Sequence, residues 1–240
     1  MLFWKDIAPL LELTMTKPDV KRAFVFSEES QRSFFIQKTH RKGNALLLLI
    51  KTQETSLESA LLHKILSEIL RTEFFEELRT RQQTAYRVYH WEEQMNESFC
   101  HCFGVQSSTH EPVDLLKRVE QFLEHFGDKI ESLVSKERFE RVQSTLLVHF
   151  QRQKEQSILA EDVHFFTTYV QGIEHLCYED LIEVAKKSFS KENQHRLAIL
   201  IEGSQHVFSA DQELEKISYR SISKSFFSMD REFFKMDSRY

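Results

Sequence analysis

One apolar stripe constrains the fold of this chain more than any other feature. Between residues 61 and 78, apolar side chains recur every third or fourth position, as Leu61, Leu62, Ile65, Leu66, Ile69, Leu70, Phe74 and Leu78. This period is typical of an amphipathic helix with one buried face. Residues 79–84 are polar, and residues 86–91 are then rich in the aromatic and β-branched side chains that favour strands. We therefore expect a long core-facing helix, a tight polar turn and a strand that begins near Tyr86.

Apolar clusters elsewhere predict the remaining elements. Strand-like clusters occur at residues 23–26, 33–36, 45–50, 98–105 and 196–201. Helical periods occur at residues 2–15, 112–130, 139–150, 159–170 and 178–185. We expect the strand at 98–105 to pair with the Tyr86 strand as a hairpin, and Pro112 to lie in the first turn of its helix. Strands, helix, hairpin, helices and strand in this order predict an α+β domain.

The composition excludes several classes of function. At 240 residues the chain is long enough for one main domain. A net charge of −5 without a long Lys/Arg block lacks the basic surface of nucleic-acid-binding proteins, so nucleic acid is not an expected partner. The longest apolar run, residues 45–50, is far shorter than the roughly 20 residues of a membrane-spanning helix. The first residues lack the parts of a signal peptide, so a cytoplasmic location is the default expectation.

The junction between the long helix and its strand resembles a motif of a known enzyme family. It reads Leu78-Arg79-x-x-x-Gln83-x-x-Tyr86-x-Val88, with Phe75 shortly before it. This is similar to the Leu-Arg-x-x-x-Gln-x-x-Tyr-x-Val signature in the non-catalytic C-terminal half of pitrilysin and insulin-degrading enzyme, which are inverzincin zinc metallopeptidases. The family usually has Leu-Gly before the Tyr, whereas this chain has Thr84-Ala85. The resemblance implies an antiparallel-rich sheet covered by helices on one face, as in domains like those of mitochondrial processing peptidase.

The same resemblance implies a role for Arg79 and Tyr86. In the family, the Arg and the Tyr of this motif reach an active site that the N-terminal half builds around zinc, so both residues are expected to bind substrate. A guanidinium and a phenol are donors suited to holding a peptide carbonyl and to stabilising an oxyanion. Without the resemblance, both would be interpreted as structural, since an Arg interacts favourably with a helix C-terminus and a strand Tyr can simply pack.

The catalytic motif of these enzymes, His-x-x-Glu-His, does not occur in the sequence. Residues 121–125 and 171–175 come closest, but both have Gln in place of the first ligand. On the helix where the family carries the motif, His63 is followed by Leu66 and Ser67 at the positions of the Glu and the second His. We expect no cofactor in this chain, and the resemblance assigns zinc to the catalytic half.

A second group of potential metal ligands is His90, Cys100, His101 and Cys102. Cys and His suit the same borderline-soft metals. However, alternate residues of a strand point to opposite faces, so His101 should face away from both cysteines. We expect these residues, and the thiols of all three cysteines, to belong to the core, and the remaining histidines to be scattered singly and solvated or partly buried.

The expected organisation has three parts. Residues 1–20 resemble the last helix of a preceding homologous domain, residues 21–208 form the peptidase-family domain, and residues 209–240 are a tail. The tail repeats Phe226-Phe227 and Phe233-Phe234 after seven residues. We expect these pairs to pack on their own domain, with a separate partner as the alternative.

These features predict a non-catalytic C-terminal domain of an insulinase/pitrilysin-like zinc metalloendopeptidase. Its expected partners are a zinc-bearing half and a peptide substrate, and alone it should not hydrolyse peptides. The alternative is a structural or interaction subunit that retained the peptidase fold without activity.

Overall fold

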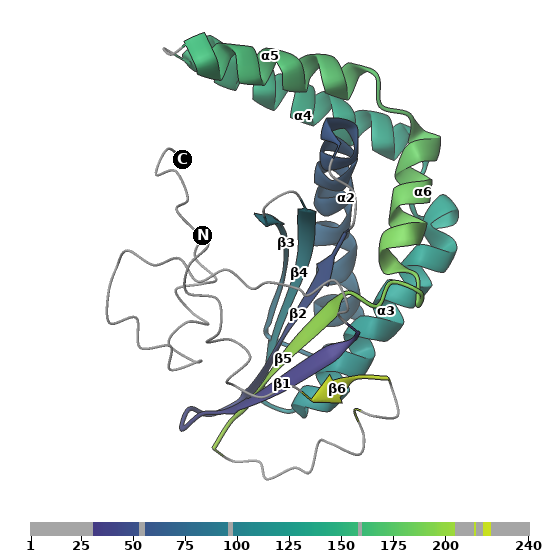
Figure 1. Cartoon of the computed structure of the whole chain (residues 1–240). Helices are drawn as coiled ribbons and strands as arrows, with labels where there is room; N and C mark the ends of the chain where they lie inside the picture. Colours follow the sequence, from purple (N-terminus) through teal and green to yellow (C-terminus); the bar gives the residue numbers. More distant parts are fainter. Residues whose placement is uncertain are drawn as a thin grey trace.

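The computed structural model describes residues 31–52, 56–95, 98–157, 160–204, 214 and 218–221. Figure 1 shows a twisted sheet with helices along one face. The six strands have the order β3-β4-β2-β5-β1-β6. They are β1 (Ser33–Lys38), β2 (Asn44–Lys51), β3 (Arg87–Met95), β4 (Ser98–Ser107), β5 (Arg196–Glu202) and β6 (Arg220–Ser221). The helices are α2 (Leu57–Phe75), the π-helix η1 (Glu76–Arg81), α3 (Pro112–Leu133), α4 (Lys136–Gln156), α5 (Ala160–Glu174) and α6 (Tyr178–Phe189).

The pairing of the strands confirms the predicted α+β fold. Strands β3, β4, β2 and β5 are antiparallel neighbours, whereas β1 pairs in parallel with both β5 and β6. The expected hairpin is β3–β4, in which Val88 lies opposite Val105. None of the described helices combines the length and the apolar character that a membrane span requires.

The main core lies between the sheet and the helices. Alternate residues of β2 and β4 face this side, among them Leu46, Leu48, Ile50, Phe103 and Val105. The residues between them form a separate apolar cluster on the other face, with Leu47, Leu49, Cys100, Cys102 and three residues of β5. Burying one such aliphatic or aromatic side chain contributes about 1.5–3 kcal/mol. The alternation therefore fixes the register of the sheet, because a shift by one residue would exchange the two faces.

Helix α2 follows the predicted stripe. The hydroxyl of Ser56 caps it by accepting a hydrogen bond of 3.1 Å from the Ser59 amide. Beyond Phe75 the helix does not end but continues as the π-helix η1. The prediction of a turn for residues 79–84 is therefore wrong at its start, since the backbone remains helical to Arg81.

Some predicted segments lie outside the described residues: the helix at 2–15, the strand at 23–26 and the Phe pairs of the tail. The strand at 196–201 was expected to be the last, but β6 follows it and pairs with β1. Leu214 and Tyr219, which precede β6, are buried in the main core. This part of the tail thus packs on its own domain.

Candidate functional site

The junction between α2 and β3 is a turn of π-helix closed by an unusual backbone conformation. The Gln82 amide donates to the Glu77 carbonyl at 2.9 Å, and the Thr84 amide donates to the Leu78 carbonyl at 2.9 Å. Gln83 between them has a φ of 51°, in the left-handed region that side chains with a Cβ rarely adopt. Single π-helical turns occur frequently at functional sites. The backbone at this junction is therefore a specific arrangement that the surrounding structure must maintain.

Contacts from β4 and α3 hold the turn in place. Leu78 is completely buried, so its side chain anchors the turn to the main core. The Ser107 hydroxyl, at the end of β4, donates to the Thr84 carbonyl at 2.7 Å. From α3, the Arg118 guanidinium donates to the Gln82 side-chain oxygen at 3.1 Å. The turn is fixed by neighbours on two different elements, which makes it a rigid support for the residues on its surface.

Arg79 and Tyr86 lie together on the outer surface of this turn. The Arg79 guanidinium carbon is 4.9 Å from the centre of the Tyr86 ring and 5.3 Å from that of the Phe75 ring. Both distances are within the range of cation–π contacts. In addition, Nη1 of Arg79 donates a hydrogen bond to the Tyr86 carbonyl. The structure thus brings together the two residues that the sequence singled out, and adds Phe75 as the second ring against the guanidinium.

The side chains of this group are open to solvent. Tyr86 is 76% exposed and Phe75 is 43% exposed. Tyr86 precedes β3 and does not pack into the core. Among the described residues, no group forms a hydrogen bond with the Tyr86 hydroxyl, and the carbonyl of Tyr86 is the single acceptor for Arg79. The pair therefore presents a phenol and several guanidinium N–H groups to an external acceptor.

A second polar group, which the sequence did not predict, is buried under α2. His63 of α2, His101 of β4 and His90 of β3 form a row joined by hydrogen bonds of 3.0 Å and 3.2 Å. The expectation that histidines other than His90 and His101 are scattered singly is wrong for His63, which is 1% exposed. Strand alternation does predict His90 and His101 on the helix side of the sheet, and the neighbouring helix face carries His63. That combination was the sequence signal from which the buried histidine row could have been predicted.

The predicted orientation of His101 and the two strand cysteines is confirmed. Cys100 and Cys102 belong to the cluster on the open face of the sheet, whereas the His101 ring contacts Phe189 of α6 on the helix side. All three cysteines are free thiols. The expectation of a core position holds for Cys100 and Cys102 but is wrong for Cys177, which is exposed at the start of α6.

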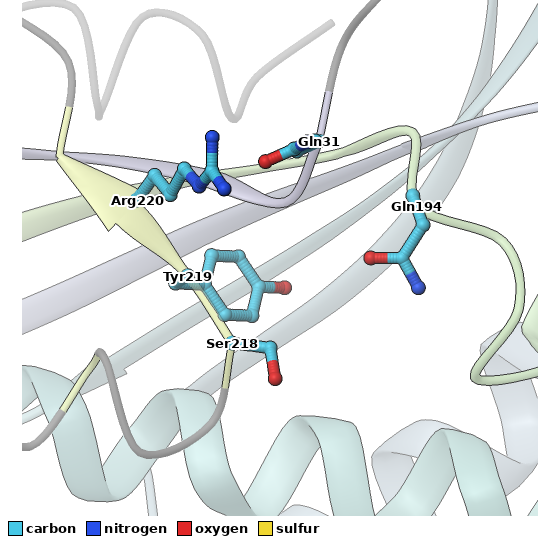
Figure 2. Close-up of a pocket in the computed structure, with 5 residues that line it drawn as sticks. All are labelled: Gln31, Gln194, Ser218, Tyr219 and Arg220. Carbon is cyan, nitrogen blue, oxygen red and sulfur yellow. The ribbon is translucent and has the colours of Figure 1, made fainter.

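A pocket of about 410 Å³ lies at the β6 edge of the sheet, the edge opposite β3, and Figure 2 shows its lining residues. Its lining consists of Gln31, Gln194, Ser218, Tyr219 and Arg220. These side chains include no carboxylate, thiol or imidazole, so the pocket offers no general base and no soft metal ligand. The Arg79–Tyr86 surface remains the candidate site.

Known proteins resemble this chain in sequence and in fold. The family of PQQ synthase PqqF-like proteins, C-terminal lobe domain 4, matches residues 65–175. Over 90 residues the chain is 31% identical to the coenzyme PQQ synthesis protein F of Pseudomonas protegens, a match that covers 38% of this chain and 11% of that protein. The structure of pitrilysin superimposes with a TM-score of 0.62 at 17% identity, covering 94% of this chain and 25% of pitrilysin. The sequence matches cover less than half of the chain and the structural likeness shows the fold; together they support a C-terminal domain of the pitrilysin/insulinase type. The residues that match this family, 65–175, include the whole Arg79–Tyr86 junction.

The pitrilysin-type fold also occurs without catalytic activity. The inactive peptidase domain of a putative zinc protease from Bordetella parapertussis superimposes with a TM-score of 0.55 at 16% identity, covering 68% of this chain and 94% of that domain. A putative zinc protease from Bordetella pertussis superimposes with a TM-score of 0.53 at 15% identity, covering 65% of this chain and 93% of that protein. At these identities the likeness shows the fold.

Packing residues occupy the positions at which the resemblance would place the zinc motif. Leu66, in place of the Glu, is completely buried in the core, and the Ser67 hydroxyl donates to Glu92 of β3. In residues 121–125 and 171–175, where Gln replaces the first ligand of the motif, His125 and His175 are exposed. Within the described ranges, no three His, Cys, Asp or Glu side chains are grouped so that they could hold a metal ion.

Proposed function

We propose that this domain forms part of the peptide-binding chamber of a pitrilysin-like zinc metallopeptidase and that Arg79 and Tyr86 contact the substrate. The main support is the pair itself: a guanidinium and a phenol with unused donors, held on a braced turn and open to solvent. An extended peptide offers carbonyl oxygens, and such acceptors match these donors. The sequence match to a peptidase-family lobe includes the turn.

The proposed contribution to the reaction is binding and charge stabilisation. In the family the zinc belongs to the other half, so this chain would supply only hydrogen-bond donors. Arg79 would hold a substrate carbonyl, and the Tyr86 hydroxyl would donate to an oxygen on which negative charge develops. The Phe75 ring also contacts the guanidinium and so limits the orientations available to it.

The proposed organisation follows the same family plan. The peptidase-family domain would occupy residues 21–208, preceded by a lead-in segment of 1–20 and followed by a tail of 209–240. The buried side chains of Leu214 and Tyr219 support a tail that packs on its own domain.

A structural subunit without activity is the second candidate. The observation in its favour is that Arg79 already donates to the Tyr86 carbonyl and stacks on two rings, which is a sufficient role for a purely structural residue. Under this proposal the turn would brace an interface and no peptide would contact the pair.

Co-purification from the native cell separates these candidates. A tagged chain should recover a partner that contains His-x-x-Glu-His, and the complex should contain zinc and cleave unstructured peptides, whereas the chain alone should do neither. A complex without zinc and without peptidase activity would instead support the structural subunit. Recovery of a stable chain with no partner would contradict both proposals.

A further inference from the structure

The buried histidine row connects the two elements that carry the candidate site. Nδ1 of His63 lies 3.0 Å from Nε2 of His101, and Nδ1 of His101 lies 3.2 Å from Nε2 of His90. His63 is 1% exposed, His101 is 0% exposed and His90 is 4% exposed. His101 is therefore the middle ring, hydrogen-bonded through both of its nitrogens. The row runs from α2 across β4 to β3, so it ties the helix to the β3–β4 hairpin.

The number of protons in this row is restricted by its geometry. A neutral imidazole has one N–H, so neutral His101 donates to one neighbour and accepts from the other. One additional proton on His101 would let it donate in both directions and preserve both hydrogen bonds. A second additional proton would place an N–H group opposite another N–H group. At the His90 end the outer nitrogen, Nδ1, is buried.

The surroundings oppose even one additional proton. Aromatic rings enclose the row, with Phe99 beside His63, Phe103 beside His90 and Phe189 beside His101. Burial, and then the positive charge of Arg71, lower the pKa of His90 to about 3. Burial, and then the neighbouring histidines, lower the pKa of His101 well below its usual value.

Among the described residues, helix α2 and strand β3 contribute charged groups near the row. Helix α2 contributes Lys64 and Arg71, and β3 contributes Glu92, whose carboxylate lies 3.7 Å from Nζ of Lys64. Glu92 also accepts a hydrogen bond from the Ser67 hydroxyl. β4 and α6 face the row with aromatic rings. The Glu92 carboxylate is thus engaged by Lys64 and Ser67.

We propose that the histidine row is a proton-sensitive link that holds the β3–β4 hairpin on α2 while its rings are neutral and releases the hairpin in acid. Arg79 follows α2 through η1, and Tyr86 directly precedes β3. Release of the hairpin would therefore separate the two residues of the candidate site. This last consequence rests on the function proposed above, whereas the link itself does not.

The direction of the pH effect follows from the two states of the chain. In the unfolded chain each histidine takes up a proton below about pH 6.5. In the native domain His90 stays neutral down to a pH of about 3. Between these values the unfolded chain binds more protons, so the free energy of unfolding decreases as the pH falls. The stability that the neutral row provides is complete above pH 6.5 and is lost progressively in acid.

Two measurements on the full chain test the link. Urea unfolding between pH 4 and pH 8 gives the number of protons taken up on unfolding from the slope of stability against pH. The variant His90→Gln keeps a neutral hydrogen-bonding group beside His101, and the exposed His125 of α3 provides the matched control His125→Gln. Proton uptake at pH 5 should fall by about one in His90→Gln and match the wild type in His125→Gln. Wild-type uptake in His90→Gln would overturn the proposal.

Hydrogen exchange, corrected for the intrinsic pH dependence of amide exchange, locates the response. As the pH falls from 7 to 4, protection in β3 and β4 should decrease before protection in β5 and α3. A uniform loss across the domain would overturn the proposal, because it would indicate general acid unfolding. If His90→Gln does not fold, ¹⁵N NMR of the wild-type imidazoles decides: neutral rings at pH 5 support the link, and charged rings at pH 5 contradict it. None of these readouts involves a peptide, so they are independent of the proposed peptidase role.

Discussion

Two Arg–Tyr groups at opposite edges of the sheet use the same side chains in different ways. Toward the β6 edge, Arg196 and Tyr219 are buried and both donate to the carboxylate of Glu120. Arg196 also donates to the carbonyls of Phe189, Ser190 and Asn193. At the β3 edge, Arg79 donates to one carbonyl and the Tyr86 hydroxyl is exposed. The first group has its donors satisfied within the chain, while the second has donors to spare.

Whether the donors are satisfied within the chain therefore distinguishes a stabilising group from a binding group better than residue type does. Burial, and then the Glu120 charge, raise the pKa of Tyr219 well above its usual value, so its hydroxyl remains a donor at every physiological pH. Tyr219 is thereby bonded to Glu120 of α3, which in turn binds Arg196 of β5. The Arg79–Tyr86 pair ties only neighbouring parts of one turn. Variants of the two groups should therefore differ in whether they change unfolding or activity.

The largest expected effect is on unfolding, from Arg196→Ala. The substitution leaves the Glu120 carboxylate buried without its cation, which costs about 3–5 kcal/mol in comparable cases. Urea denaturation should show this loss, and the exposed Arg141→Ala on α4 should leave the midpoint unchanged. Equal stability of Arg196→Ala and Arg141→Ala would mean that the buried group is not required for folding.

The next effect is on catalysis, from Tyr86→Phe in the complex with the proposed zinc-bearing half. Loss of one donor to a developing oxyanion typically costs about 2.7–4 kcal/mol of transition-state stabilisation. The kcat should therefore fall by about 10²- to 10³-fold. Arg79→Ala should lower kcat/KM as well, with a contribution from weaker peptide binding.

Neither variant should shift the Tm of the isolated chain, because both side chains are outside the core. Full peptidase activity of both variants would contradict the site assignment. Loss of folding in both would show that the turn is structural, as the second candidate function requires.

Tyr219→Phe is the matched counterpart of Tyr86→Phe and should act on stability alone. It removes the donor to Glu120 inside the core, and leaving a buried acceptor with one partner fewer costs about 1–3 kcal/mol. Thermal unfolding should reveal the loss, with peptidase activity of the complex unchanged below the transition. If Tyr219→Phe and Tyr86→Phe gave the same profile, the contrast between satisfied and unused donors would have no predictive value.

The smallest expected effect comes from Gln83→Gly. Gln83 has a φ of 51°, a conformation that costs residues with a Cβ about 1–2 kcal/mol and that Gly adopts freely. The substitution should stabilise the domain by about 1 kcal/mol or less, because Gly also gains entropy in the unfolded chain. A urea midpoint lower than that of the wild type would indicate that the Gln83 side chain itself supports the turn.

Most of the secondary structure was predictable from periodicity. The stripe of α2 and the alternation in β4 depend on local burial, which the sequence records directly. For the same reason the opposite orientations of His101 and Cys102 could be predicted. The motif also singled out Arg79 and Tyr86, and the structure places their side chains beside each other.

The features that were not predicted depend on distant contacts or on small backbone changes. Glu120 and Tyr219 are 99 residues apart, and no local pattern links them. The two-residue β6 is too short to show alternation. The continuation of the helix to Arg81 depends on a change in hydrogen-bond spacing, from four residues to five, that polar side chains tolerate without any compositional sign.

The π-helical turn makes the direction of Arg79 a matter of residue count. An α-helix turns by about 100° per residue, so deleting one residue from Glu76–Arg81 would restore regular spacing and rotate everything beyond it by roughly that angle. The side chains could all be retained and the helix would still be well formed. Arg79 would nevertheless face a different direction from the Tyr86 ring. Engineered or natural length changes in this segment should therefore abolish the pair where most point substitutions would preserve it.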